Sequence, residues 1–399
     1  MKSALIIYFL PLVFALTTIY FISDYDELNR IFYGRNNISK IEINNSNYIG
    51  SFDNTDYYEE IFLKSGKSSD IIYLLGSSEL TGSTALKPYN FISSHFNTPV
   101  YSIGHAGNQC FSIFSQLFAN KERLNETPIV IILSPGWFAD KSALGTSSES
   151  FLEFNSERFL KKILNNTDDE YFKNYESKRI NQLYSDFNSP NLEIKILNFE
   201  HLASKSIIHK LCYTPLIYCD RYLLKLKDKI NQSKQLNNSE YIRRPIIPSQ
   251  VIINWDSIYS TSRTTVLKAS NNNSFGIENI IFTNNIRNKF GFISPVDEHN
   301  NTELYDFKIL IDFLKKKNVK ASFIISPLNA LYIKNLGEFL PTMKIIEDEI
   351  NKSGFPYLNL MELEKTKYDK ALLFDVMHLS DFGWSKVNNF IINTYNLNK

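Results

Sequence analysis

Five short apolar runs constrain the fold of this chain more than any other feature of its sequence. None of them is longer than five residues, and they lie at residues 71–75, 100–103, 129–133, 321–325 and 357–360. Short continuous apolar runs are typical of strands that are buried on both faces of a sheet. The pattern therefore predicts a parallel sheet with helices on both sides.

Helical patterns separate most of these runs. The expected helices cover residues 108–124, 302–317, 329–352 and 380–396. The alternation predicts an α/β fold, a three-layer αβα doubly wound parallel sheet. The third and fourth runs are separated by residues 134–320, far more than one crossover needs. We therefore expect a large, mostly helical insertion at about 140–300, with helices in 149–230 and irregular structure in 236–295.

The charge and composition exclude several classes of protein. The 399 residues carry 43 Lys and Arg against 42 Asp and Glu, a net charge of +1, and 14% are aromatic. Such a chain is not a disordered tail, and it lacks the broad positive field that suits binding to nucleic acid phosphates. A chain of this length can bury a core that needs no metal or disulfide. We expect no nucleic acid partner, and we assign the chain no metal and no cofactor.

The three cysteines are too few for a disulfide scaffold. Cys212 and Cys219 could pair across a short loop, which would leave Cys110 in an apolar run as the odd one out. Three buried or unpaired thiols are the alternative. The spacing does not choose between the two.

The first residues of the chain predict a membrane anchor. Residues 3–23 contain no charged side chain, and their length is close to the ~20 apolar residues that cross a bilayer as a helix. Lys2 precedes the segment and three acidic residues follow it closely, so the positive-inside rule places the N-terminus in the cytoplasm. A cleaved signal peptide is the alternative, although its apolar core is usually only ~7–15 residues long.

The anchor hypothesis divides the chain into three parts. The membrane helix occupies residues 1–23. Residues 24–68 are polar and rich in Asn and Ser, which is typical of a stalk. The α/β domain then covers 69–399 and lies outside the cytoplasm.

The sharpest candidate for a functional residue follows the first apolar run. Gly76 comes directly after the run, and Ser77, Ser78 and Glu79 follow where a helix is expected to begin. In an open α/β sheet, ligands bind at the carboxyl ends of the strands. A serine at this point can act as a nucleophile if a base lies within reach. The alternative is that Ser77 or Ser78 only caps the helix.

A second candidate lies between the last predicted strand and the last predicted helix. Asp375 precedes His378 by three residues, and a carboxylate so close can hold an imidazole in one tautomer. With Ser78, these residues would form a Ser, Asp and His triad. The alternative is a solvated loop with a helix cap at Ser380 or Asp381.

These elements resemble a known family. A G-x-S block early in the sheet, a glycine loop after the second strand and D-x-x-H before the last helix are the pattern of the SGNH (GDSL-like) hydrolases. More specifically, the chain is similar to the DltD family, the membrane-anchored proteins of teichoic acid D-alanylation. The similar segments are GSSEL (76–80), IGHAGNQ (103–109), LSPGWF (133–138), NNSFGIENIIFTNN (272–285), ISPLNALY (325–332) and DVMHLSDFGW (375–384). The resemblance covers essentially the whole chain.

The resemblance implies roles for individual residues. Ser78, the third residue of the G-x-S block, matches the nucleophile. His378 matches the general base, and Asp375 matches the group that orients it. The backbone N–H groups of Ser78 and of Gly104 or Gly107 would form the oxyanion hole.

Four further residues are candidates for the site. Ser77 is the alternative position for the nucleophile. Glu79 could pair with the ammonium group of a D-alanyl substrate, or it could only favour the N-terminus of a helix. His105 follows the second predicted strand near the same sheet edge, and Trp137 could either contact substrate or pack in the core.

The block after the third predicted strand departs from the SGNH pattern. SGNH enzymes usually supply an Asn side chain from this block, whereas residues 134–137 read SPGW here. The DltD family is similar in this respect, except that we expect Gln where this chain has Gly136. The departure leaves the third oxyanion donor unassigned and would weaken the hydrolysis of ordinary esters.

The resemblance also implies an activity and partners. A D-alanyl group would pass through an acyl-serine to a hydroxyl of teichoic acid, a polyol phosphate. The implied partners are the D-alanyl donor, the envelope polymer, a polytopic membrane O-acyltransferase of the DltB type and a D-alanyl carrier protein. Two alternatives stay open. One is an SGNH-type esterase or polysaccharide O-acetyltransferase of the cell envelope, and the other is a non-catalytic scaffold that recruits the carrier and the membrane acyltransferase.

Overall fold

The computed structural model describes most of the chain. The described residues are 47–49, 71–82, 84–96, 98–125, 127–166, 168–184, 191–234, 253–283, 286–287 and 290–397. The chain divides into two compact units, and of the described residues the smaller unit holds 177–184 and 191–234. The larger unit, which contains the sheet, holds the rest. The predicted anchor at 1–23 lies outside the described residues, as does most of the predicted stalk.

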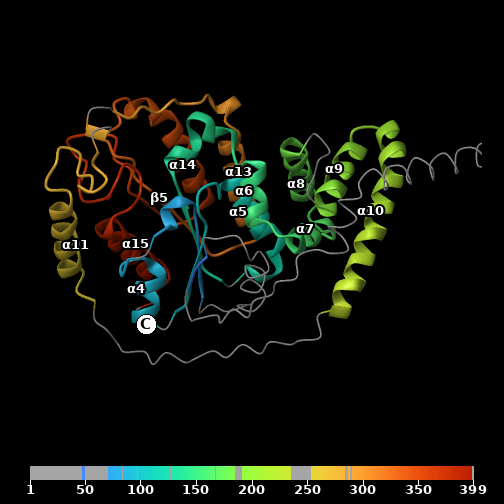
Figure 1. Ribbon diagram of the computed structural model, residues 1–399, viewed down its shortest axis with the longest axis horizontal. Coiled ribbons are helices and arrows are strands. Elements are labelled where there is room, and N and C mark those ends of the chain that lie inside the picture. The colour runs from blue at the N-terminus through green and yellow to red at the C-terminus, as the bar shows by residue number, and fades with distance from the viewer. Residues whose placement is uncertain are drawn as a thin grey trace, which may run out of the picture. The chain divides into compact units, whose positions relative to one another are not determined.

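The larger unit is built on one six-stranded parallel sheet (Figure 1). The strands are β1 (Asn47–Ile49), β2 (Ile72–Leu75), β3 (Val100–Ile103), β4 (Ile129–Leu133), β5 (Ala321–Ile325) and β6 (Tyr357–Asn359), in the order β1-β3-β2-β4-β5-β6. Strands β2 to β6 coincide with the five apolar runs, so the predicted parallel α/β sheet is confirmed. Strand β1 was not predicted, because it lies inside the polar segment 24–68 that suggested a stalk.

The strand order reverses at β2. The chain moves from β2 to β3 on one side and then returns to β4 on the other side, where Leu75 is in register with Ile131. In an open α/β sheet, such a reversal leaves a crevice at the carboxyl ends of the strands. The segments that follow β2, β3 and β4 therefore border the place where a ligand is expected to bind.

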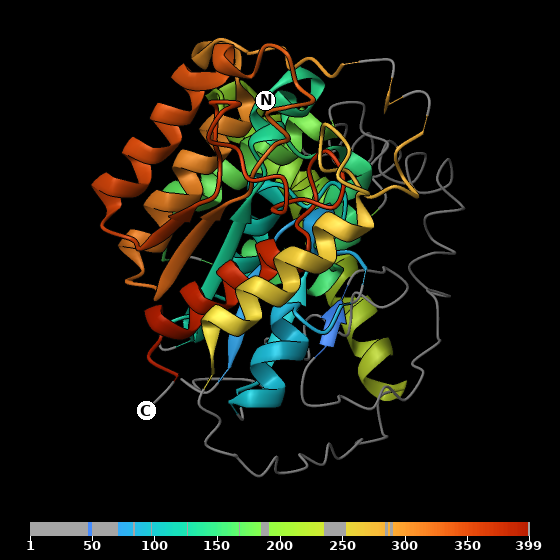
Figure 2. The ribbon, with the colours of Figure 1, turned by 90° about the vertical axis from the view of Figure 1, so that its left-hand side faces the viewer.

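Helices cover both faces of the sheet (Figure 1). On one face, α4 (Pro88–His95) packs against β3 and α15 (Asp381–Thr394), and α11 (Trp255–Ala269) lies against α15, as Figure 2 shows. On the other face, α13 (Thr302–Lys316) packs against both α5 (Cys110–Ala119) and α14 (Leu340–Ser353). The larger unit therefore has three layers, with the sheet in the middle.

Aromatic side chains form much of the core on the α5 side. Every residue of α5 is buried. The ring of Phe114 stacks on Phe118 at 5.5 Å between centroids and meets Phe313 of α13 edge-on at 5.5 Å. Phe172 meets Phe313 at 5.3 Å. Because each buried ring contributes about 1.5–3 kcal/mol relative to an exposed one, this cluster fixes α5 and α13 on the sheet.

The insertion is mostly helical, as predicted for its first part. Its helices are α6 (Ser148–Phe154), α7 (Glu157–Leu164), α8 (Glu170–Leu183), α9 (Leu192–Ser204) and α10 (Ile207–Lys234). Polar N-caps begin three of them, because the side chains of Ser147, Ser156 and Asn191 accept hydrogen bonds from backbone N–H groups of the first turn. No helix among the described residues is long and apolar enough to cross a membrane.

Two predictions about the position of helices were wrong, one for residues 329–352 and one for residues 236–295. The helix expected at 329–352 begins only at Leu340, because the Asn329 side chain accepts from the N–H groups of Leu331 and Tyr332 and folds that segment into a loop. The region 236–295, expected to be irregular, contains α11, whose first turn is capped by Asn254.

The three cysteines are free thiols, so the pairing of Cys212 with Cys219 is not formed. Both residues lie in one helix, α10. Seven residues of α-helix separate two Cα atoms by about 10.5 Å, whereas a disulfide needs roughly 4.4–6.8 Å. The helix expected in 149–230 is continuous across both residues and keeps them apart, so the alternative of three unpaired thiols holds.

Candidate active site

Residues 76–81 follow β2 at the reversal of the sheet, and we call them the nucleophile turn because they contain Ser78, the candidate nucleophile. The first residue of this turn is tied to neighbouring segments, because the Gly76 N–H donates to the carbonyl of Ile103 at 3.2 Å. The Asn108 side chain in turn donates to the carbonyl of Gly76 at 3.0 Å. Gly104 allows this approach: it has φ +145°, and a Cβ there would lie 1.8 Å from the Gly76 oxygen.

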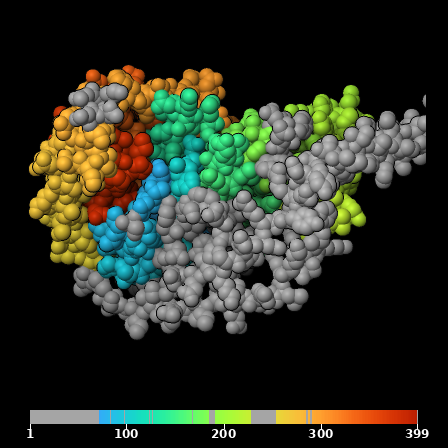
Figure 3. Space-filling view, viewed as in Figure 1, coloured from blue at the N-terminus to red at the C-terminus, as the bar shows by residue number. Residues whose placement is uncertain are grey.

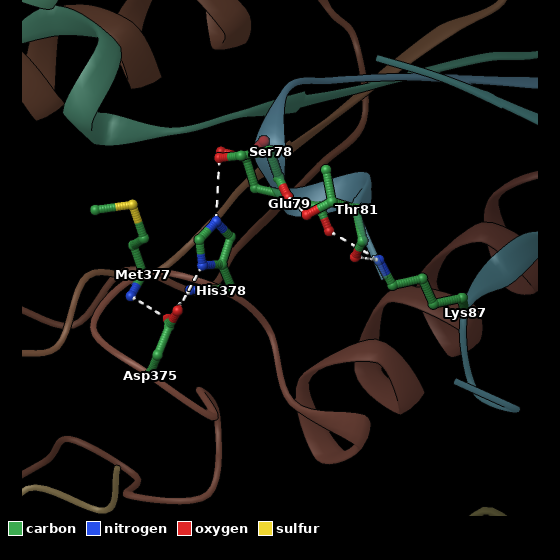
Figure 4. A network of polar contacts seen from close by, with 7 residues as sticks. All are labelled: Ser78, Glu79, Thr81, Lys87, Asp375, Met377 and His378. Atoms are coloured by element: carbon green, nitrogen blue, oxygen red, sulfur yellow. Dashed lines mark hydrogen bonds and ion pairs between the residues drawn. The ribbon is translucent and has the colours of Figure 1, made fainter. Parts of the chain in front are cut away.

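The structure brings Ser78, His378 and Asp375 together, although the first two are 300 residues apart in the chain (Figure 4). The distance from His378 Nε2 to Ser78 Oγ is 3.1 Å. The distance from His378 Nδ1 to Asp375 Oδ2 is 2.6 Å. In the space-filling view, the red C-terminal part of the chain and the blue residues after β2 meet on the same face (Figure 3).

The histidine loop, residues 374–380, is held by its own carboxylate. Asp375 Oδ1 accepts from the backbone N–H of Met377 at 2.8 Å and from that of His378 at 2.7 Å. The N–H of Phe374 donates to the carbonyl of His378 at 3.1 Å. Ser380 caps α15 by accepting from Gly383, so the predicted cap at Ser380 is present together with the Asp375 to His378 contact.

The ionisation of the pair favours a charged couple. Burial alone would raise the pKa of Asp375, but the hydrogen bond and charge of His378 outweigh it and lower that pKa. Burial alone would lower the pKa of His378, but the hydrogen bond and charge of Asp375, with a smaller contribution from Glu79, raise it. The imidazole is therefore a stronger base than an ordinary histidine.

Ser77 and Ser78 are neighbours with different surroundings. Ser77 is buried, and its hydroxyl donates to the carbonyl of His105 at 3.0 Å. The hydroxyl of Ser78 lies against His378. Neither serine caps the 3₁₀ helix η1 (Ser78–Leu80) with its side chain. The geometry thus favours Ser78 over Ser77 for contact with the base.

Glu79 is the residue of the nucleophile turn that follows Ser78. Its side chain is buried, and Oε2 accepts from the backbone N–H of Ser77 at 3.0 Å. Burial raises the pKa of Glu79, although hydrogen bonds from Ser77 and the Ser134 side chain oppose the shift. A carboxylate placed in this way supports the turn from inside rather than facing an incoming ammonium group.

Lys87 is a site residue that the sequence analysis missed. Its ammonium group is buried and donates to the carbonyls of Glu79 at 3.2 Å, Leu80 at 2.7 Å and Thr81 (Figure 4). Burial lowers the pKa of Lys87 to about 8, against the attraction of Glu79. The sequence pattern does not distinguish this lysine from a surface one, although its partners Glu79, Leu80 and Thr81 lie only a few residues earlier in the chain.

The predicted oxyanion donors border the same turn. Gly107 has φ +94°, and a Cβ there would lie 2.2 Å from Ser150 Oγ on α6. Within the described residues, the backbone N–H groups of Ser78 and Gly107 donate to no acceptor. Gly104 lies against Gly76. The three candidate donors, Ser78, Gly104 and Gly107, therefore belong to the two segments that follow β2 and β3.

The two remaining candidates lie outside the hydrogen-bonded triad. Trp137 belongs to the 3₁₀ helix η3 (Pro135–Phe138) and is buried, which agrees with packing in the core. His105 Nδ1 lies 2.6 Å from the carbonyl of Ala106, and its Nε2 lies 3.7 Å from Glu153 Oε2. Neither ring contacts Ser78 or His378 through a hydrogen bond among the described residues.

Asn108 is a second residue that was missed, although it lies in the IGHAGNQ segment. It is fully buried, and its Oδ1 accepts from Gln116 Nε2 at 2.9 Å while its amide donates to Gly76. The sequence signal was an Asn directly after a Gly-rich turn. Through these two hydrogen bonds, the Asn108 amide links Gly76 of the nucleophile turn to Gln116 of α5.

Ser78, His378 and Asp375 are thus joined by hydrogen bonds at the switch point of a parallel α/β sheet, where open sheets of this class bind their ligands. Comparison with known families gives a narrower assignment. The model of the DltD protein family matches residues 48–396, and the chain therefore belongs to the DltD family. No curated protein sequence matches it. Membership places the chain among membrane-associated envelope proteins and implies a part in the D-alanylation of teichoic acid.

Proposed function

We propose that the chain is a serine-dependent acyltransferase that moves a D-alanyl group to a hydroxyl of teichoic acid. The observation that carries the proposal is the position of His378, whose two ring nitrogens lie within hydrogen-bond distance of Ser78 and Asp375. A base held on one side by a carboxylate and facing a hydroxyl on the other can activate that hydroxyl. Membership of the DltD family suggests that the transferred group is D-alanyl and that the acceptor is teichoic acid.

In the first half-reaction, Ser78 Oγ attacks the carbonyl carbon of the D-alanyl donor. Its proton moves to His378 Nε2, and the carbonyl oxygen becomes an oxyanion. N–H groups of Ser78 and of Gly104 or Gly107 would stabilise that charge. The bond to the leaving group then breaks, the leaving group takes the proton from His378, and D-alanyl Ser78 ester remains.

In the second half-reaction, a hydroxyl of the polyol phosphate attacks the ester carbonyl. Its proton moves to His378 Nε2, and the oxyanion forms at the same place. When the bond to Ser78 Oγ breaks, the serine recovers its proton from His378 and the D-alanyl ester of the polymer is released. Asp375 keeps Nδ1–H oriented in both halves.

The family also guides the proposal for setting and partners. We place the chain in the cell membrane through a single-pass anchor at residues 1–23, with the α/β domain outside the cytoplasm and an SGNH-like fold. The proposed partners are a DltB-like polytopic acyltransferase and, upstream, a D-alanyl carrier protein. Residues 134–137 contain no Asn, so we expect weak hydrolysis of ordinary esters.

The test replaces each of the two neighbouring serines. Ser78→Ala is expected to reduce D-alanyl transfer by about 10³-fold or more, because the nucleophile is lost. Ser77→Ala removes a buried hydroxyl beside it and serves as the matched control, with most activity kept. If Ser78→Ala keeps full D-alanyl transfer to the polymer, Ser78 is not the nucleophile and the proposal fails. If only simple esters are cleaved and no polymer is D-alanylated, the esterase alternative replaces it.

A further inference from the structure

Helix α10, Ile207–Lys234, has two apolar faces on opposite sides. One face packs on α9, where the ring of Tyr213 stacks on Phe199 at 5.5 Å and Leu224 is buried. Arg221 forms an ion pair with Glu200 of α9 at the edge of this contact. This face explains why α10 folds as a helix beside α9.

The second face is exposed along the first half of the helix. It consists of Ile207, Ile208, Leu211, Pro215, Tyr218 and Tyr222. The exposed fraction of the five non-proline side chains runs from 63% for Tyr222 to 79% for Ile207. With 3.6 residues per turn, these positions share an arc of about 100° and a length of roughly 22 Å. A continuous exposed stripe of large apolar side chains marks an interaction site.

The exposed charges along the first three turns of this stripe are of one sign. Lys205 and Lys210 are exposed, and no Asp or Glu occurs from residue 201 to residue 219. Asp220, which lies within the length of the stripe, is buried. In the chain as a whole, acidic and basic residues are almost equal in number, 42 against 43. The stripe is therefore a local cationic and apolar surface in a neutral protein.

We propose that this face of α10 binds the surface of an anionic lipid bilayer, with the helix lying parallel to the membrane plane. Ile and Leu would enter the boundary between headgroups and acyl chains, while Tyr218 and Tyr222 and the two lysines lie at headgroup level. The opposite face stays on α9, so lipid can cover only one side. The surface goes beyond the acyl-transfer proposal and does not depend on it.

The test measures where this face lies in the full chain, because the predicted anchor would hold the chain to any bilayer. A bimane label is placed at Leu211→Cys or, as the matched control two residues away on the other side, at His209→Cys. Both carry Cys212→Ser and Cys219→Ser, while Cys110 is buried and stays. The chains are reconstituted in nanodiscs of phosphatidylglycerol and phosphatidylcholine that contain doxyl-labelled lipid.

Doxyl lipid is expected to quench the label at position 211 several-fold more than at 209, and aqueous iodide should show the reverse order. Replacing phosphatidylglycerol by phosphatidylcholine should weaken the doxyl quenching at 211. The proposal is overturned if iodide reaches both labels equally and doxyl lipid affects neither. It is also overturned if the label at 211 is shielded only in native membranes, because the face would then bind a protein. Unfolding curves of the labelled chains verify that the fold is kept.

Discussion

The nucleophile turn and the histidine loop meet at the hydrogen bond between Ser78 and His378, yet they are held in different ways. Asp375 organises the histidine loop through contacts within three residues of itself. The nucleophile turn depends on partners far along the chain, among them Asn108, 32 residues from Gly76. A locally closed loop can keep its geometry alone, whereas the turn is only as rigid as the sheet edge around it.

The two segments also differ in how their surroundings shift the pKa values of their ionisable groups. The histidine loop places its charged groups where each stabilises the other, so the pKa of Asp375 falls and that of His378 rises. At the nucleophile turn, burial is the largest cause of the pKa shifts. It raises the pKa of Glu79 and lowers the pKa of Lys87 to about 8. Both shifts favour neutral forms. Under the proposed mechanism the first pair serves proton transfer, whereas the second pair supports the backbone of the turn.

Among the residues that support the two segments, the largest effect is expected from Asp375→Asn, which removes the carboxylate that organises the histidine loop. The amide cannot accept the Nδ1–H in the same way, so we expect kcat to fall by about 10³-fold. His378 must be neutral to take the proton from Ser78, so wild-type activity should decline as the pH falls through its raised pKa. In the variant that decline should move to lower pH, because the carboxylate no longer raises the pKa.

The measurement is kcat for D-alanyl transfer as a function of pH. Asp381→Asn, in the first turn of α15, is the control and should leave both the rate and the acid limb in place. An unchanged acid limb in Asp375→Asn would contradict the pairing of Asp375 with His378.

Gly104→Ala tests the long-range support of the nucleophile turn. A Cβ at this position would meet the Gly76 carbonyl at 1.8 Å with the backbone at φ +145°. We expect the free energy of unfolding to fall by about 2–4 kcal/mol, measured by urea denaturation. Gly337→Ala meets no atom within 4 Å and should change stability by less than about 0.5 kcal/mol. Equal stability of the two variants would mean that the turn does not depend on the β3 segment.

Lys87→Met tests the buried support and should have the smallest effect. Loss of the three carbonyl contacts is expected to lower kcat about tenfold with little change in KM, because the nucleophile is less well oriented. As the pH rises through about 8, the wild-type ammonium loses its charge, so wild-type kcat should decline there. Lys87→Met should lack that alkaline limb, and the exposed control Lys367→Met should keep it. An unchanged kcat with the limb intact would remove Lys87 from the site.

Local features of the sequence predicted local features of the structure. The five apolar runs gave β2 to β6 because a buried strand needs little more than continuous apolar side chains. Asp375 and His378 were found because their contact spans three residues. Helix α11 was missed in an Asn- and Ser-rich region, where Asn254 is a cap that begins the helix rather than a sign of a loop.

Non-local support could not be predicted. Asn108 acts on the nucleophile turn through a contact that spans 32 residues and joins the segments after the paired strands β2 and β3. For Glu79 the sequence left two alternatives open, contact with a substrate ammonium group or a place in the first turn of a helix, and the structure places it buried in the first turn of η1. Strand β1 escaped detection because three residues in a polar segment carry no period that separates an edge strand from a linker.

The central claim is that Ser78 carries the D-alanyl group. The most direct test incubates the full chain with a D-alanyl donor, stops the reaction with acid and finds the acylated residue by mass spectrometry of its peptides. We expect one D-alanyl ester on Ser78, absent in Ser78→Ala and present in Ser77→Ala. Transfer of D-alanyl to the polymer with no ester on Ser78, or with the ester on Ser77, would contradict it.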